Sequence, residues 1–137
     1  MSDLILFDTS VLVDDLRTGC HERRMQAVGG LVRTSAAVLA EMWRGTRKPA
    51  EREFLRALQR NHPVLFPTAG NWLESGQLLA KMGVDKGFTG EKLRDLHFDV
   101  LIALTARSHG ARLITSNQAD FELIHAYCKF KLEVWTP

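Results

Sequence analysis

The sequence predicts a three-layer α/β/α sandwich with a mainly parallel central sheet, built as a single domain over residues 1–137. The length supports one domain, because a chain of this size buries enough surface to form a core without metal or disulfide staples. The composition is 45% hydrophobic and 25% charged, which is typical of globular proteins. Short apolar runs also alternate with longer stretches of helical periodicity, which is the pattern of βαβ units.

The first expected unit is a strand followed by a short helix. Residues 4–7 form an apolar run that ends at Asp8, as a buried parallel strand would. The polar Thr9 and Ser10 can cap a helix over 10–17. The second expected unit follows the Gly29-Gly30 break, with a strand at 31–34 and an apolar helix at 35–43 that stops before Gly45.

The second half of the sequence continues the alternation. Pro49 is suited to the first turn of a charged helix that runs to about residue 60. A strand is expected near 64–66, and residues 71–82 form an amphipathic helix that ends at Gly83. The remaining expected elements are a long helix over 91–108 ended by Gly110, a strand over 112–115 and an alternating, edge-like strand over 131–135.

Two acidic residues stand out in the first half. Asp8 directly follows the first strand, and a helix cap is an equal explanation for it. Glu41 lies in a segment of almost entirely apolar neighbours. A surface pair with Arg44 is the alternative for Glu41, but a pair of this kind contributes only about 0.3–0.5 kcal/mol and does not explain an acid in so apolar a segment.

Asp99 is more unusual, because it lies in an apolar part of the long helix with no basic residue one turn away. Asp95 lies one turn before it, and like charges at that spacing repel. The alternative is that Asp99 caps a helix that begins at Val100. Asn117 and Asp120 follow the fourth strand, where they are also ordinary turn and first-turn residues.

The acids become informative as a group, because functional groups in parallel sheets gather at the carboxyl ends of the strands. Oxygen ligands without His or Cys suit Mg²⁺ or Mn²⁺ and do not suit zinc. Such ions can activate water and stabilise the leaving oxygen in phosphodiester hydrolysis. The sequence therefore indicates a metal site for Mg²⁺ or Mn²⁺, which would also relieve the repulsion between Asp95 and Asp99.

The chain resembles PIN domains, and within them the VapC-type toxin ribonucleases of bacterial toxin–antitoxin pairs. The resemblance covers essentially the whole length. Its motifs are Asp8-Thr9-Ser10 after the first strand, Ala40-Glu41 followed by Gly45, Asp99-Val100-Leu101-Ile102-Ala103, Gly110, and the segment from Leu113 to Phe121. The last two segments, in this order and at this separation, are the most specific.

The resemblance implies a metal-dependent endoribonuclease that cleaves single-stranded or loop RNA, with an antitoxin partner, a homodimer and a location in the bacterial cytoplasm. It implies Asp8, Glu41 and Asp99 as the acidic triad. Many relatives carry a fourth acid, an Asp, at the position of Asn117. Here Asn117 keeps an oxygen ligand without its charge, so either Asn117 or Asp120 can complete the site.

In the expected mechanism, each of these residues has a separate role. Asp8 and Asp99 hold the metal directly, while Glu41 holds a water or a second ion and acts as general base. Ser10 and Thr115 are the expected substrate-positioning residues, and Ser10 could also orient Asp8 or a metal-bound water. His97, two residues before Asp99, is expected to be a packed or exposed histidine without a catalytic role.

The charge pattern suggests where RNA would bind. The net charge of +2 is too small to indicate a nucleic-acid binder alone, but the basic residues include twelve Arg against six Lys, and Arg favours phosphate contacts. Candidate contacts to the RNA backbone are Arg44, Arg47, Arg52 and Arg56. Arg60 continues the stripe at the same spacing, and the alternative is a solvated helix face in which Glu51 and Glu53 are interleaved.

Apolar side chains suggest two partner surfaces, with burial in the core as the alternative for each residue. An antitoxin helix would need an apolar groove, for which the candidates are Val11, Leu12, Leu16, Ala36, Leu39, Trp43 and Leu55. A dimer interface would use Trp72, Leu78, Leu79, Met82 and Phe88.

Several other classes are disfavoured. No apolar run reaches the roughly 20 residues of a membrane span, and the beginning of the sequence is not a secretory signal, so Cys20 and Cys128 are expected to be reduced thiols in the cytoplasm. A receiver domain would need an acidic pair directly after the first strand, and a haloacid-dehalogenase-type phosphatase would need Asp in place of Ser10. The remaining alternative is a PIN-fold module that binds RNA or an antitoxin without cleaving, with Asn117 as the first sign of lost chemistry.

Overall fold

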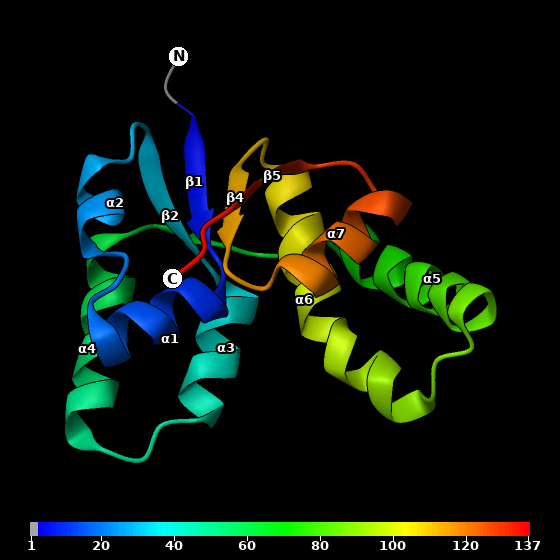
Figure 1. Cartoon of the computed structure of the whole chain (residues 1–137), viewed down its shortest axis with the longest axis horizontal. Coiled ribbons are helices and arrows are strands. Elements are labelled where there is room, and N and C mark those ends of the chain that lie inside the picture. The colour runs from blue at the N-terminus through cyan, green and yellow to red at the C-terminus, as the bar shows by residue number, and fades with distance from the viewer. Residues whose placement is uncertain (1–2) are drawn as a thin grey trace.

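The computed structural model describes residues 3–137 and contains a five-stranded sheet in which every strand pairing is parallel (Figure 1). The strands are β1 (Leu4–Phe7), β2 (Leu31–Ser35), β3 (Val64–Leu65), β4 (Arg112–Thr115) and β5 (Lys131–Val134). The helices are α1 (Thr9–Thr18), α2 (Glu22–Ala27), α3 (Ala36–Arg44), α4 (Pro49–Asn61), α5 (Ala69–Lys86), α6 (Gly90–Ser108) and α7 (Gln118–Tyr127). The α/β class and the parallel sheet are confirmed.

The strand order is β3-β2-β1-β4-β5, so β1 lies at the centre and the chain extends the sheet to both sides of it. Leu6 pairs with Arg33 on β2 and with Leu113 on β4. Because all strands run in the same direction, their carboxyl ends lie at one edge. Asp8 follows β1 at this edge, α3 follows β2, and the segment before α7 follows β4.

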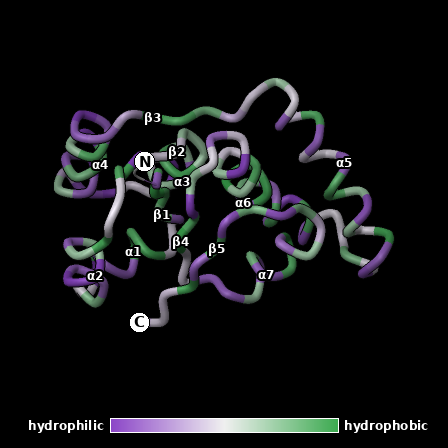
Figure 2. Tube along the Cα trace, turned by 90° about the horizontal axis from the view of Figure 1, so that it is seen from above, coloured by the Kyte–Doolittle hydropathy of each residue, from purple (hydrophilic) through white to green (hydrophobic). Residues whose placement is uncertain are grey.

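Helices flank the sheet on both sides (Figure 1). The helices α1, α2 and α4 lie on one side, and α5, α6 and α7 lie on the other, while α3 lies beyond the carboxyl ends of the strands. Figure 2 shows hydrophobic stretches at the centre of the molecule and hydrophilic turns on the outer helices. This arrangement leaves the edge with Asp8 between α1, α3, α6 and α7.

The core fills the space between the sheet and its helices. On the strands, Ile5, Leu6 and Leu113 are fully buried, and on α6 the run from Val100 to Ala106 is buried throughout. Burial all round in the second half of α6 explains why its sequence shows little amphipathic periodicity. The position of Asp99 is thus set by a helix that is anchored over its whole later half.

Some helix boundaries differ from those expected. The helix α5 is longer than the predicted 71–82, because Thr68 and Asn71 cap its start reciprocally and Gly83 lies within it. A Cβ at Gly83 would lie 3.2 Å from Leu93 Cδ1, so the glycine permits close packing of α5 on α6. The helix ends instead at Gly87, which has a φ of 66°.

Two helices were missed or only partly foreseen. The sequence did not predict α2, which buries none of its side chains, and it indicated only the beginning of α7. As expected, β5 forms an edge of the sheet, and both cysteines are free thiols, Cys20 exposed and Cys128 buried. Within residues 3–137, no helix combines the length and the apolar character that a membrane span requires.

Candidate active site

Four carboxylates meet at the carboxyl edge of the sheet, and we call Asp8, Glu41, Asp99 and Asp120 the acid cluster. The effect of the other three acids on the pKa of Asp99 shows that the four carboxylates lie close together. Burial, followed by the charges of Asp8, Glu41 and Asp120, raises the pKa of Asp99 from 3.8 to about 8, and the charge of Lys92 opposes this rise. The cluster draws on four elements, since Asp8 caps α1, Glu41 lies on α3, Asp99 on α6 and Asp120 on α7.

Asp8 is 2% exposed and is held firmly on one of its two oxygens. Its Oδ2 accepts hydrogen bonds from Ser10 Oγ at 2.7 Å, from Thr115 Oγ1 at 2.9 Å and from the Ser10 backbone at 3.4 Å. Its Oδ1 is buried and has no partner among the described residues. Burial raises the pKa of Asp8, and the hydrogen bonds from Ser10 and Thr115 oppose this rise. Asp8 is therefore a helix cap on one oxygen and a free ligand on the other.

Ser10 and Thr115 both donate hydrogen bonds to Asp8, and the substrate-positioning role expected for them stays a prediction. The two hydroxyl oxygens lie 3.2 Å apart. Ser10 Oγ also accepts a hydrogen bond from the Ser116 backbone, and Thr115 Oγ1 accepts one from the Asn117 backbone. These contacts connect the start of α1 to the segment after β4, so Asp8 is oriented by both sides of the cluster.

Glu41 is half-buried and contacts Thr9, a residue to which the sequence had assigned only a capping role. Thr9 Oγ1 donates to Glu41 Oε1 at 2.5 Å. No salt bridge among residues 3–137 joins Glu41 to Arg44, so the surface pair considered from the sequence is absent. The Arg44 guanidinium lies instead 5.2 Å from the centre of the Phe98 ring.

Asp99 is not a helix cap, because α6 begins nine residues earlier and is capped by Thr89. None of the side-chain hydrogen bonds among the described residues involves its carboxylate. Asp95 is exposed and is not among the groups that raise the pKa of Asp99. The main like charges that act on Asp99 are therefore acids from other elements, and not Asp95.

The segment after β4 holds both candidates for the fourth position of the site, Asn117 and Asp120. Asn117 caps α7, and its Nδ2 donates to Asp120 Oδ2 at 3.1 Å. Lys92 Nζ contacts Asp120 Oδ1 at 3.2 Å. Of these two residues, Asp120 is the one whose negative charge helps to raise the pKa of Asp99. Asp120 is thus the fourth carboxylate of the cluster, and Asn117 orients it.

Sequence reasoning missed Lys92. The residue lies two helical turns before Asp99, on the same face of a helix that the sequence did predict. This spacing could have indicated Lys92 as a partner of the acids, but the sequence prediction considered basic residues only within one turn of Asp99. His97 contacts residues outside the acid cluster. Its Nε2 lies 3.1 Å from Ser75 Oγ, and its ring packs edge-on against Trp72.

The residues fit a hard divalent cation in chemistry, although they are not arranged as a finished site. The unpartnered Asp8 Oδ1 and the raised pKa of Asp99 both indicate that a positive charge would be favourable here. Within residues 3–137, no three acidic, His or Cys side chains are placed to hold one ion together. Glu41 is directed to Thr9 and Asp120 to Lys92 and Asn117, so their carboxylates would have to turn towards the ion.

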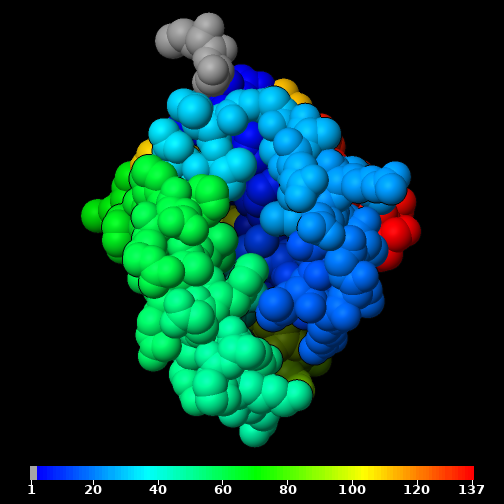
Figure 3. Space-filling view, turned by 90° about the vertical axis from the view of Figure 1, so that its left-hand side faces the viewer, coloured from blue at the N-terminus to red at the C-terminus, as the bar shows by residue number. Residues whose placement is uncertain are grey.

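A cavity of about 340 Å³ opens beside Glu41, between α1, α3 and α4. Figure 3 shows the hollow between the surface of α1 and α2 and the surface of α3 and α4. It is lined by Thr9, Val13, Leu16, Arg17, Glu41, Met42, Gly45, Thr46, Lys48, Glu51, Phe54 and Leu55. Of the groove residues proposed from the sequence, Val11, Leu12, Leu39 and Leu55 are buried in the core, whereas Leu16 is 45% exposed.

The candidate RNA-binding arginines are spread along α3, α4 and their connection, and the structure does not bring them into the acid cluster. Arg44 and Arg47 are exposed, and Arg52 is half-buried. Arg56 lies 3.8 Å from Glu53 and stacks over Trp43, and Arg60 lies 3.6 Å from the same Glu53. The exposed pairs with Glu53 match the solvated-face alternative for the last two positions of the stripe.

Comparisons with known proteins bear on the family and the fold of the chain. The family model of the PIN domain matches residues 5–126. The structure of VapBC-1 from nontypeable Haemophilus influenzae is similar with a TM-score of 0.72 at 20% identity, covering 98% of this chain and 99% of that chain. VapBC2 from Rickettsia felis, bound to a DNA fragment from its promoter, is similar with a TM-score of 0.70 at 20% identity, covering 96% and 98%.

A third solved structure, VapBC-5 from Mycobacterium tuberculosis, a member of the VapBC family of toxin–antitoxin systems, has a TM-score of 0.61 at 18% identity and covers 98% of both chains. No curated protein matches the sequence. At these identities the solved structures support the fold.

Proposed function

The chain belongs to the PIN-domain family, and we propose that it is a Mg²⁺- or Mn²⁺-dependent endoribonuclease that cleaves single-stranded or loop RNA as the toxin of a toxin–antitoxin pair in the bacterial cytoplasm. The observation that carries this proposal is the convergence of four carboxylates at a partly buried position, where burial and then the charges of Asp8, Glu41 and Asp120 raise the pKa of Asp99 to about 8. A cluster of this kind is costly to a fold unless a cation neutralises it, and carboxylate oxygens are the ligands that Mg²⁺ takes.

Each side chain has a distinct part in the proposed reaction. Asp8, through its free Oδ1, and Asp99 would hold the ion, which would stabilise charge on the phosphate oxygens. Ser10 and Thr115 keep Asp8 in place. Glu41, oriented by Thr9, accepts a proton from the attacking water, whose oxygen bonds to phosphorus as the bond to the leaving oxygen breaks. The leaving oxygen takes up a proton from solvent.

The test is cleavage of a fluorescent RNA hairpin with a single-stranded loop by the purified chain, in Mg²⁺ and then in chelator. The wild type should cleave only with the metal, and Asp8→Ala and Asp99→Asn should lose about 10³-fold or more of the rate. Asp95→Asn is the matched control, because Asp95 lies on the same helix but outside the acid cluster, and it should cleave normally. Equal cleavage by wild type and Asp99→Asn would refute the proposed site.

A second candidate function is a module that binds RNA or an antitoxin without cleaving. One observation favours it, since Glu41 and Asp120 are both directed to other side chains and no three ligands are preformed. Titration with Mn²⁺ separates the two functions. A binding module would show no saturable Mn²⁺ binding, whereas the enzyme would bind Mn²⁺ and lose that binding in Asp8→Asn.

The proposed antitoxin would dock a helix in the cavity between α1, α3 and α4, because this hollow is partly apolar and reaches Glu41. The partner is expected to be encoded by the open reading frame beside this one. Co-expression should give a co-purifying pair that Leu16→Arg disrupts. Retention of the partner by Leu16→Arg would exclude this groove.

The proposed homodimer would bury an apolar surface on the opposite side of α3. Phe66, Trp72 and Leu73 are 63%, 54% and 73% exposed, and a hollow of about 220 Å³ lined by Ala40 and Phe98 adjoins them. Leu79 and Met82, also considered for the interface, are buried in the core. Sedimentation should show a dimer that Leu73→Glu converts to a monomer, while Leu16→Arg leaves it a dimer.

A further inference from the structure

We propose that Lys92 is a phosphate-binding residue of the site, whose ammonium group holds Asp120 in the metal-free protein and contacts a phosphate oxygen of the RNA when the strand is bound. This inference rests on the proposed ribonuclease function. It assigns a substrate contact to a side chain outside the set of acids and outside the arginine stripe.

The first support is the position of the ammonium group. Lys92 Nζ lies 3.2 Å from Asp120 Oδ1, at the edge of the acid cluster that α6 and α7 form. The side chains are 38% and 28% exposed, so the pair lies at the opening of the site and not in the core. An ammonium group has three N–H donors and one of them contacts Asp120, so donors remain for a ligand that enters from solvent.

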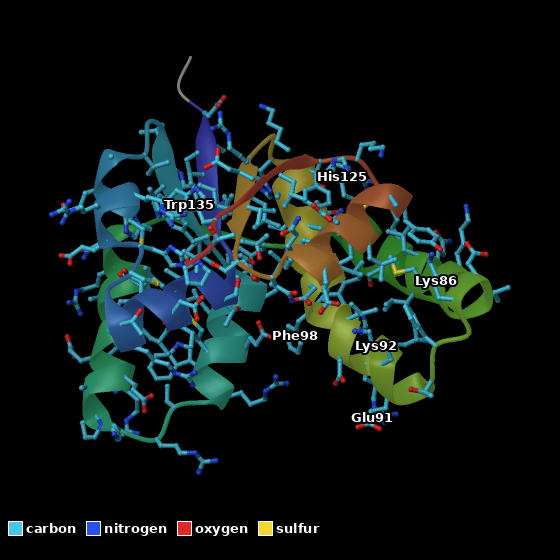
Figure 4. All side chains as sticks on the ribbon, in the orientation of Figure 1. Lys86, Glu91, Lys92, Phe98, His125 and Trp135 are labelled. Atoms are coloured by element: carbon cyan, nitrogen blue, oxygen red, sulfur yellow. The ribbon has the colours of Figure 1, made fainter. Side chains whose placement is uncertain are left out.

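The second support is that the backbone of Lys92 is fixed while its head group can move. Lys92 lies in the first turn of α6, where its backbone N–H donates to Thr89 Oγ1 at 3.2 Å. Its Nζ lies 5.9 Å from the centre of the Phe88 ring. Figure 4 shows Lys92 on the part of α6 that extends away from the sheet. A fixed base with a flexible four-carbon stem lets the charge move between Asp120 and a nearby phosphate.

The third support is electrostatic. Lys92 stands in the first turn of a helix, where the macrodipole disfavours a cation. An RNA strand that approaches the cluster meets four carboxylates, and Lys92 offers its phosphates a positive charge at the opening. Helix stability does not explain a cation in the first turn of α6. Its position beside several carboxylates is better explained by a function.

The proposal also explains why both carboxylate oxygens of Asp120 accept hydrogen bonds from other side chains in the metal-free protein. Both of its oxygens are occupied, by Lys92 and by Asn117, and the carboxylate is therefore not available as a ligand. Movement of Lys92 to the RNA would release Asp120 Oδ1 towards the ion. Loss of Lys92 should then have opposite effects on the two ligands, tightening the binding of a divalent cation and weakening the binding of RNA.

The experiment uses Lys92→Ala, Lys92→Arg and the matched control Lys86→Ala, which removes an exposed lysine at the distant end of α5 (Figure 4). Without RNA, Lys92→Ala should bind Mn²⁺ about three- to ten-fold more tightly than wild type, because one positive charge is removed from the cluster. Lys86→Ala should bind Mn²⁺ like wild type. Weaker Mn²⁺ binding by a folded Lys92→Ala protein would overturn the proposal.

The second measurement is the salt dependence of RNA affinity, by fluorescence anisotropy in Mg²⁺ and in a Glu41→Gln background that prevents cleavage. Lys92→Ala should reduce the slope of log K against log salt by about 0.7, the value for one phosphate contact to a single strand. Lys92→Arg should restore the slope, and Lys86→Ala should not change it. An unchanged slope in Lys92→Ala overturns the proposal even if the wild type cleaves RNA.

Failure of the ribonuclease function has a different signature. If the wild type does not cleave but the slope falls in Lys92→Ala, the phosphate contact stands and the chain is a binding module. If the wild type neither binds nor cleaves RNA, both proposals fail. If the wild type cleaves and the slope is unchanged, only the role of Lys92 fails.

Discussion

Replacement of Asp99 by Asn should stabilise the protein in the absence of divalent metal. The carboxyl has a pKa of about 8 in the folded protein against an ordinary value of 3.8, so the folded state favours its protonated form. Its ionisation therefore destabilises the fold. This cost is absent below pH 3.8, grows as the pH rises and is complete above pH 8. Asn has nearly the same shape and never carries the charge.

The two pKa values set an upper limit of about 4 kcal/mol for this cost at pH 7. Asp99 is only partly buried, and water screens the repulsion, so we expect a gain of about 2 kcal/mol for Asp99→Asn. For a chain of this size the gain corresponds to an increase in Tm of roughly 6–10 °C. None of the side-chain hydrogen bonds among residues 3–137 involves this carboxylate, so the exchange loses none, and it removes only the favourable charge interaction with Lys92.

The assay is urea unfolding of wild type, Asp99→Asn and the control Asp95→Asn in chelator, at intervals between pH 4.5 and pH 8. The advantage of Asp99→Asn over wild type should grow with pH, whereas Asp95→Asn should stay within about 0.5 kcal/mol of wild type because Asp95 is exposed. Addition of Mg²⁺ should then stabilise the wild type more than Asp99→Asn. A loss of stability in Asp99→Asn, or a gain that does not depend on pH, would refute the reasoning and indicate a structural role for Asp99.

Three further predictions concern RNA binding and the fold. Replacement of both Arg52 and Arg56 by Ala should reduce the salt slope of RNA affinity by about 1.4 if both contact phosphates. An unchanged slope would show that this face of α4 is a solvated surface that does not contact RNA. Leu113→Ala in the fully buried centre of β4 should cost about 2–5 kcal/mol in urea unfolding, and a cost under 1 kcal/mol would contradict the packing described. Gly30→Ala should destabilise the fold by about 1–3 kcal/mol, since Gly30 has a φ of 129° and its added Cβ would lie 2.6 Å from the Asp3 carbonyl oxygen. A neutral thermal melt of Gly30→Ala would show that this turn can relax.

The central part of the fold was predictable because its local signals agree with the tertiary structure. The strand before Asp8 is a short apolar run in the sequence and a buried central strand in the fold. Other elements depend on contacts that no local pattern contains. The helix α2 buries none of its side chains, and the turn before it is held by the buried His21, whose backbone N–H donates to Asp15 Oδ1. The sequence predicts a helix end at Gly83, because the packing of Gly83 against Leu93 cannot be seen in the sequence.

The acids of the site were also identifiable from the sequence, because a carboxylate among apolar neighbours needs an explanation. Their partners were not. The contact between Thr9 and Glu41 joins residues 32 positions apart, and the contact between Lys92 and Asp120 joins residues 28 positions apart. Both depend on how helices pack, so the sequence could place the charges at one edge but could not say which of them are already occupied.

The central place of β1 has a consequence for the order in which the protein is assembled. Its neighbour β2 is synthesised soon after it, but its other neighbour β4, which carries the hydroxyl that fixes Asp8, follows 107 residues later. A growing chain on the ribosome can thus hold Asp8, Glu41 and Asp99 and still lack the strand that brings them into one place. Such long-range pairing makes folding slow and late. If the chain is a nuclease, it therefore gains its activity only after β4 has been synthesised and paired with β1, and a nascent chain that lacks β4 carries the acids without an assembled site.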